Sequence, residues 1–195
     1  MMQFRIVAAA TLLLALVGLS PAQQRTPPER QPDEPRRSAL DESVIVVTPE
    51  HSRAVERGLE WLAASQVTSG TERGAWIAQI GYKLNTGYKY TSADKGHVGV
   101  TAMAGMAFLA GGHLPGRGKY GRNVEDALEF VLKAVQTDGY VTHAGSRMYS
   151  HAFATLFLAE VYGQTHRQDI RSKLQLAVDF IVHSQNSDGG WRYEP

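Results

Sequence analysis

Five stretches of the chain place apolar residues at helical spacing, and they differ in how those residues are distributed. The first, third and fifth carry charges along one side, whereas the second and fourth are apolar on nearly every side. A helix that is apolar all round lies in a protein interior or in a membrane, and these two are too short to span a bilayer. The alternation predicts outer, inner, outer, inner and outer helices, over residues 49–65, 97–110, 123–135, 148–162 and 169–184.

A turn signal follows the first, third and fifth stretches. Its complete form consists of Gln185, Asp188, Gly189, Gly190 and Trp191. Weaker forms consist of Gln136, Asp138, Gly139 and Tyr140, and of Gln66, Gly74 and Trp76. Each follows a similar run of four residues, at 58–61, 127–130 and 177–180. Aspartate favours a local bond from side chain to backbone, and glycine allows a positive φ where the chain reverses. A helix-then-turn unit that recurs every roughly 50 to 70 residues predicts a helical repeat.

The complete turn resembles the QW motif, Q-x-x-D-G-G-W, of squalene and oxidosqualene cyclases, which share an α/α toroid with the β subunits of protein prenyltransferases. The run 149–163 also resembles a helix of exported bacterial proteins in this group. The resemblance covers residues 49–195 and implies an all-α, two-layer α/α toroid-like helical repeat. Five helices make a partial toroid, so we interpret the chain as a fragment of a longer protein. The alternative is self-association that covers the open inner face.

The N-terminus has the pattern of a secretory signal. A short basic start precedes the apolar run 6–19, and small residues around Ala22 favour cleavage there. Residues 1–22 are therefore predicted to be a signal peptide, with an uncleaved membrane anchor as the alternative. Residues 23–48 are rich in proline and charge, and they predict a disordered spacer with a short apolar arm at 44–47. These patterns predict an exported protein, periplasmic or secreted.

Composition limits the partners and cofactors. The chain has 20 basic and 19 acidic residues, and one of the basic residues is Arg5 in the predicted signal. This balance gives no electrostatic reason to expect nucleic acid or an anionic surface. There is no cysteine, so the Asp-Cys-His zinc site of prenyltransferases cannot be built in full. The histidines also lack the spacing of metal ligands, so we expect neither a metal nor another cofactor.

The resemblance implies that reactive residues sit where the inner helices begin. We assign no catalytic residue, because the acidic D-x-D-D motif of terpene cyclases is absent and would lie in another part of a longer chain. The ligand-binding candidates are His97 before the second helix, and Tyr149 and His151 at the fourth. The alternative is that these are satisfied polar groups at the entrance to the core. The long segment 67–96, which carries four aromatic residues, predicts either a lid or a patch on the outer wall.

Three functions remain open at this level. The first is an exported, non-catalytic toroid module that binds an apolar or extended ligand or a protein partner. The second is a terpenoid (squalene) cyclase-like enzyme whose acid motif lies outside this chain. The third is a toroid enzyme that acts on a polysaccharide. Export favours the first over the second, because isoprenoid substrates are made in the cytoplasm. We expect no nucleic-acid partner and no membrane span beyond the signal segment.

Overall fold

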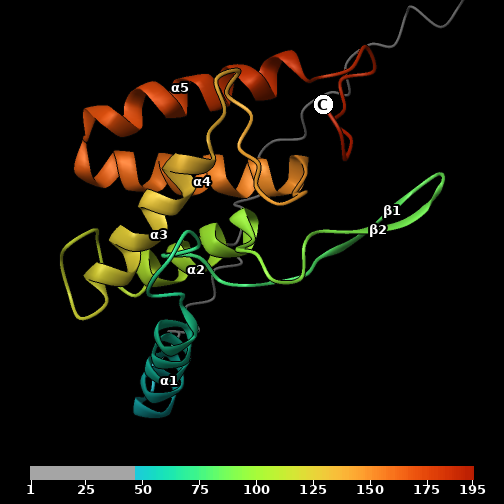
Figure 1. The fold of residues 1–195 in the computed structure, drawn as a ribbon. Coiled ribbons are helices and arrows are strands. Elements are labelled where there is room, and N and C mark those ends of the chain that lie inside the picture. The colour runs from blue at the N-terminus through green and yellow to red at the C-terminus, as the bar shows by residue number, and fades with distance from the viewer. Residues whose placement is uncertain (1–46) are drawn as a thin grey trace, which may run out of the picture. The chain divides into compact units, whose positions relative to one another are not determined.

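The computed structural model describes residues 47–195, which form an all-α unit with one small sheet (Figure 1). The elements in order are α1 (Pro49–Ser65), β1 (Gly81–Leu84), β2 (Gly87–Tyr90), α2 (Val98–Ala110), α3 (Gly121–Ala134), α4 (Met148–Thr165) and α5 (Gln168–His183). The five helices confirm the predicted fold class. The predicted signal peptide and all but the last two residues of the spacer lie outside the described residues, and they stay predictions.

The helix ends follow local chemistry. Thr48 and His51 form a reciprocal capping box at the start of α1: Thr48 Oγ1 accepts from His51 N, and His51 Nδ1 accepts from Thr48 N, both at 3.3 Å. The end of α4 differs from the sequence prediction: the helix continues through Gly163, where the sequence predicted that it would stop. It stops only when His166 adopts the left-handed conformation with φ 54°.

The inner layer is the contact between α2 and α4, and α3 and α5 pack on its outside. Glycine in α2 allows the two inner helices to approach closely. A Cβ at Gly105 would stand 2.5 Å from Cε2 of Phe157, so the ring lies against bare backbone. The first helix, α1, contacts α2 mainly through the buried Leu59. This arrangement reproduces the predicted alternation of outer and inner helices.

One side of the inner layer is uncovered among residues 47–195, as expected for a partial toroid with an open inner face. Met103, Phe153 and Leu156 are large apolar residues that remain exposed, and we call them the open inner face. The sequence pattern indicated that such a face exists but not which residues form it, because periodicity shows that a helix is apolar without showing which side is covered. No helix within residues 47–195 has the length and apolarity needed to cross a membrane.

The long segment 67–96 is partly ordered as a hairpin. Strands β1 and β2 pair antiparallel, with Gly81 opposite Tyr90 and Leu84 opposite Gly87, and they extend away from the helices (Figure 1). Within residues 47–195 this two-stranded sheet is the only one, which agrees with the predicted all-α fold class. Trp76, in the same segment, is instead buried in the core.

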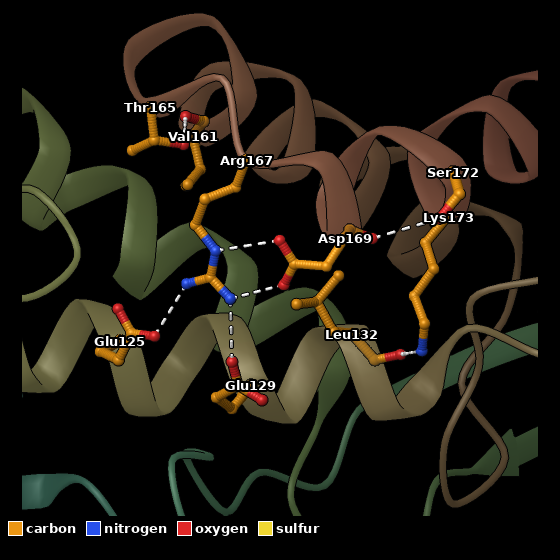
Figure 2. Close-up of polar contacts among 9 residues, drawn as sticks. All are labelled: Glu125, Glu129, Leu132, Val161, Thr165, Arg167, Asp169, Ser172 and Lys173. Atoms are coloured by element: carbon orange, nitrogen blue, oxygen red, sulfur yellow. Dashed lines mark hydrogen bonds and ion pairs between the residues drawn. The ribbon is translucent and has the colours of Figure 1, made fainter.

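A guanidinium fastens the outer helices α3 and α5 together (Figure 2). Arg167, just before α5, donates to Glu125 at 2.8 Å and to Glu129 at 3.3 Å, both on α3. It also pairs with Asp169 at 2.6 Å, and this bond is the largest factor that lowers the pKa of Asp169. Lys119, just before α3, contacts Glu56 and Glu60 on α1 in the same way. Before α3 and before α5, a cation thus binds a glutamate pair on the previous outer helix.

Three turns follow the outer helices: turn 1 (residues 66–76), turn 2 (residues 135–141) and turn 3 (residues 185–191). Turns 1 and 3 use their glutamines alike. Gln66 Nε2 donates to Gly74 O at 2.9 Å, and Gln185 Nε2 donates to Gly189 O at 2.7 Å. Each amide therefore ties the end of its helix to the far side of the turn.

The tryptophans of turns 1 and 3 also match. Trp76 Nε1 donates to Leu62 O at 3.0 Å, and Trp191 Nε1 donates to Ile181 O at 2.7 Å. In both turns the acceptor lies four residues before the glutamine. The surroundings differ, since Trp76 is 4 % exposed and Trp191 is 49 % exposed.

Turn 2 requires a correction to the sequence alignment. Gln136 N donates to Tyr140 O at 2.9 Å, as Asn186 N donates to Gly190 O at 3.0 Å in turn 3. Gln136 is thus the counterpart of Asn186, and Val135 occupies the glutamine position. The sequence alignment of Gln136 with the motif glutamine is therefore shifted by one residue. Backbone hydrogen bonds set the register of a turn, whereas residue identity alone does not.

Side-chain oxygens hold the tips of turns 2 and 3. Asp138 Oδ1 accepts from Tyr140 N at 2.9 Å, which is the local bond that the sequence predicted for aspartate. In turn 3 this role passes to Asn186, whose Oδ1 accepts from the backbone N of Asp188 and of Gly190. Both turns are thereby closed by their own residues.

A glycine in each turn marks the approach to the next outer helix. Gly74, Gly139 and Gly189 all have positive φ, between 82° and 92°. A Cβ at Gly74 would stand 2.0 Å from Asp126 O on α3, and one at Gly139 would stand 2.2 Å from Leu176 O on α5. Turns 1 and 2 therefore touch the backbone of the following outer helix.

The two tryptophans provide a test of the repeat within one chain. Trp76→Ala should cost about 3–5 kcal/mol of unfolding free energy, because it empties a buried site. Trp191→Ala should cost less than half as much, since half of that ring already contacts solvent. Urea titrations followed by circular dichroism give both values. Equal losses for the two variants would contradict this assignment.

Candidate functional site

A cleft of about 240 Å³ opens where the starts of α2 and α4 meet the hairpin and the segment after turn 3. Its lining includes Tyr82, Thr91, His97, Arg147, Tyr149 and Tyr193, and we call it the tyrosine cleft. Two of the three predicted ligand-binding residues, His97 and Tyr149, therefore lie in one cleft. They come from the two inner helices, as the resemblance implied.

His97 contributes a neutral imidazole to the cleft. The residue is the N-cap of α2, and its Nδ1 accepts from Val100 N at 3.2 Å. With Nδ1 acting as an acceptor, the neutral ring carries its proton on Nε2. Burial of the ring lowers the pKa of His97, so the charged form is disfavoured. The cleft thus holds a hydrogen-bond donor without a positive charge at this position.

A carboxylate in turn 1 fixes the backbone just before His97. Glu72 Oε2 accepts from Gly96 N at 2.9 Å and lies 3.0 Å from His143 Nε2. Burial acts to raise the pKa of Glu72, but the hydrogen bonds from Gly96 and His143, together with the charges of His143 and Lys95, lower it overall. The ionised carboxylate therefore anchors the entry to α2 and with it the position of His97.

Three tyrosine rings form the wall of the cleft. Tyr149, in the first turn of α4, meets Tyr193 edge to face with 5.2 Å between ring centroids. Tyr193 in turn lies 6.2 Å from Tyr82 on β1. The backbone of Tyr193 is fixed as well, because its carbonyl accepts from Met148 N at 3.1 Å. These rings present apolar faces with polar hydroxyl edges.

Arg147 joins the hairpin to the start of α4. Its guanidinium lies 4.6 Å from the centroid of the Tyr82 ring and donates to Tyr82 Oη at 2.8 Å. It also forms an ion pair with Glu194. The one guanidinium that lines the cleft is therefore already engaged with an aromatic face and a carboxylate.

His151, the third candidate, lies in the core and not in the cleft. Its side chain is fully buried; Nδ1 accepts from Val141 N at 2.9 Å, and Nε2 donates to Ala177 O at 3.1 Å. Burial lowers the pKa of His151, against an opposing effect of the bond to Ala177. Both ring nitrogens are thus occupied in joining turn 2 to α5, which matches the alternative interpretation of a satisfied polar group.

The chemistry available in the cleft suits binding. The donors include a neutral imidazole, tyrosine hydroxyls and the hydroxyls of Thr91, Ser146 and Ser150, set among aromatic faces. Within residues 47–195, no three histidine or acidic side chains converge as metal ligands would. Arg147, the charged residue that lines the cleft, is paired with Glu194, so the cleft offers a ligand aromatic faces and neutral hydrogen-bonding groups.

Sequence reasoning missed Arg147 and Tyr193. Both lie next to segments that it did single out: Arg147 precedes the predicted fourth helix, and Tyr193 follows the complete turn by two residues. Tyr82 was noted only as one of several aromatic residues in a long loop. Nothing in the sequence shows that these three residues meet, because more than sixty positions separate Tyr82 from Arg147, whose side chains bond to each other.

The structure resembles two solved structures of variants of the type II terpene cyclase MstE from Scytonema, both in complex with the substrate geranylgeranyl dihydroxybenzoate. The first match has a TM-score of 0.50 at 20% sequence identity, and it covers 75% of this chain and 35% of the cyclase chain. The second has a TM-score of 0.49 at 20% identity, with 74% and 34% covered. No family model and no curated protein matches the sequence.

The likeness to the cyclase shows the fold alone, at this level of identity. The chain has a terpene cyclase-like helical fold, and it spans about a third of the length of the cyclase chain that it matches. The predicted relation to squalene and terpene cyclases is thus supported at the level of architecture.

The buried histidines predict how stability depends on pH. Since the folded state lowers the pKa of His151 and of His97, the unfolded state binds more protons below the ordinary histidine pKa of about 6.5. The contribution of these two histidines to the unfolding free energy is present above the ordinary histidine pKa, and it is lost as pH falls toward their lower folded-state pKa. Thermal melts should show lower stability near about pH 5.5 than near about pH 7.5.

The variant His151→Gln should reduce this pH dependence, because an amide can accept from one backbone group and donate to another without titrating. The matched control is His183→Gln on the exposed side of α5. It should melt in parallel with the parent at every pH. An unchanged pH dependence in His151→Gln would contradict the role assigned to His151.

Proposed function

We propose that the chain is an exported, non-catalytic α/α toroid module that binds an apolar, extended ligand in the tyrosine cleft. The observation that carries this proposal is the meeting of three tyrosine rings and a neutral His97 at the ends of the inner helices. Such a wall favours a chain-like apolar molecule with one hydrogen-bonding group. The open inner face is a second apolar surface, suited to a protein partner or to self-association.

A second candidate is a terpenoid cyclase-like enzyme whose acid motif lies outside this chain. The architecture it shares with a type II terpene cyclase favours it. Protonation of an alkene requires an acidic group of unusual strength, and the cleft described above offers tyrosines and a histidine instead. We therefore rank binding above cyclisation, and we rank a glycan-acting enzyme third because no paired carboxylates line the cleft among its described residues.

Ligand binding can be tested by removing one wall of the cleft. Geranylgeraniol, a linear isoprenoid alcohol, should bind the full chain, and a soluble glucan oligosaccharide should not. Tyr149→Ala should weaken the isoprenoid affinity by about 2- to 10-fold, which corresponds to the loss of one aromatic contact worth about 0.5–1.5 kcal/mol. Isothermal titration calorimetry measures both ligands.

The matched control is Tyr88→Ala on the hairpin. Tyr88 is 66 % exposed, close to the 64 % of Tyr149, but it lies outside the cleft lining. Its variant should bind the isoprenoid like the parent. Equal weakening by both substitutions would argue against the cleft, and preference for the oligosaccharide would favour the glycan candidate.

The enzymatic candidate predicts turnover that the binding proposal does not. The full chain, incubated with squalene or with geranylgeranyl dihydroxybenzoate, should release no cyclised product over a heat-killed control. Gas or liquid chromatography with mass spectrometry detects such products. Turnover that is lost in Tyr149→Phe would instead support the cyclase candidate.

A further inference from the structure

The three outer helices share a stripe of side chains in which an apolar residue, a small residue and an aromatic residue follow at intervals of three. The stripe consists of Val55, Gly58 and Trp61 on α1, of Val124, Ala127 and Phe130 on α3, and of Leu174, Ala177 and Phe180 on α5. The small residue always precedes the glutamine position of the following turn by eight residues. This constant register makes the three helices directly comparable.

On α3 and α5 the small residue of the stripe lies against the turn that precedes it. Ala127 and Ala177 are fully buried. Ala127 follows Asp126, whose carbonyl lies against Gly74 of turn 1, and Ala177 follows Leu176, whose carbonyl lies against Gly139 of turn 2. Phe180 also stacks on Tyr140 of turn 2, with 4.8 Å between centroids. The surface of a turn and the stripe of an outer helix are therefore two halves of one repeated contact.

On α1 the same stripe is open. Val55 is 58 % exposed and Trp61 is 67 % exposed, whereas their counterparts Val124 and Phe130 on α3 are buried. A Cβ at Gly58 would have none of the described atoms within 4 Å. No turn precedes α1 among residues 47–195, so the stripe on α1 has no turn surface to pack against there.

Turn 3 carries the other half of this repeated contact, the turn surface, and this surface also has no partner among residues 47–195. In turn 1 the Gln66 amide donates both to Gly74 O and to Asn123 O on α3. In turn 3 the Gln185 amide bonds within its own turn, and within the described part of the chain the closest approach to a Cβ at Gly189 is Gln185 Nε2 at 3.8 Å. The surface that binds an outer helix is thus formed and exposed.

The charges at these two surfaces are complementary. In turn 1, Arg73 precedes the glycine and pairs at 2.8 Å with Asp126, which precedes the small residue of α3. The corresponding residues are Asp188 in turn 3 and Arg57 on α1, so the signs are reversed. Neither Asp188 nor Arg57 forms an ion pair with residues 47–195. An α1 helix bound to turn 3 would form the corresponding ion pair, with the acidic residue on the turn and the basic residue on the helix.

We infer that turn 3 binds helix α1 of a second copy of this chain, in the register that α3 and α5 adopt on turns 1 and 2. Gly58 then lies against Gly189, the Trp61 ring becomes covered, and Arg57 pairs with Asp188. The contact joins two different surfaces, so it is heterologous and assembles copies head to tail. It is separate from the tyrosine cleft and from the open inner face.

Reversing the charge of each partner tests both the contact and the pairing of Arg57 with Asp188. Sedimentation of the full chain should show association that increases with concentration. Arg57→Asp alone and Asp188→Arg alone should each lose it, because like charges then meet at every contact. An equimolar mixture of the two variants should restore association, since each contact again joins opposite charges. Both sites are exposed, so circular dichroism and melting of the variants should match the parent.

Two further variants separate this contact from others. Gly58→Gln should abolish association by filling the space for the turn, while Gly58→Ala should keep it, because alanine occupies this position on α3 and α5. Leu156→Gln, on the open inner face, should leave it unchanged. A parent that stays monomeric, a mixture that fails to restore assembly, or association lost only in Leu156→Gln would overturn the inference.

Discussion

The close approach of turns 1 and 2 to the backbone of the next outer helix sets the geometry of this fold. Gly74 and Gly139 have no side chain and a positive φ, and each lies where a Cβ would overlap a helix carbonyl. An L-residue with a Cβ would move the turn away and separate the outer helices. The clamps by Lys119 and Arg167 depend on the same spacing, because a salt bridge spans only a few ångströms.

His151 shows how the repeat keeps this contact when its sequence changes. Turn 2 has Val135 where turns 1 and 3 have glutamine, and it therefore lacks the amide that joins turn 1 to α3. The imidazole of His151 takes its place from the inner helix α4, by accepting from Val141 N and donating to Ala177 O. A buried group with both nitrogens satisfied stabilises the layer, and it is costly to charge.

The tyrosine cleft depends on the same layer order. Because α2 and α4 lie side by side, their first turns place His97 and Tyr149 at one end of the inner layer. The hairpin and the segment after turn 3 then supply Tyr82 and Tyr193 from positions far apart in the sequence. The function proposed for the cleft follows from this convergence of rings, while the fold itself is shared with a terpene cyclase of different length.

The sequence by itself determined the five helices, their alternation as outer and inner elements, and the existence of the turns, because periodicity and glycine act over short distances. It also placed His97 and Tyr149 where inner helices begin. Only the tertiary structure decided that these two residues share a cleft with Tyr193, that His151 is a core residue, and that turn 2 is shifted by one position. These outcomes depend on which backbone groups meet across helices, and no local pattern encodes that pairing.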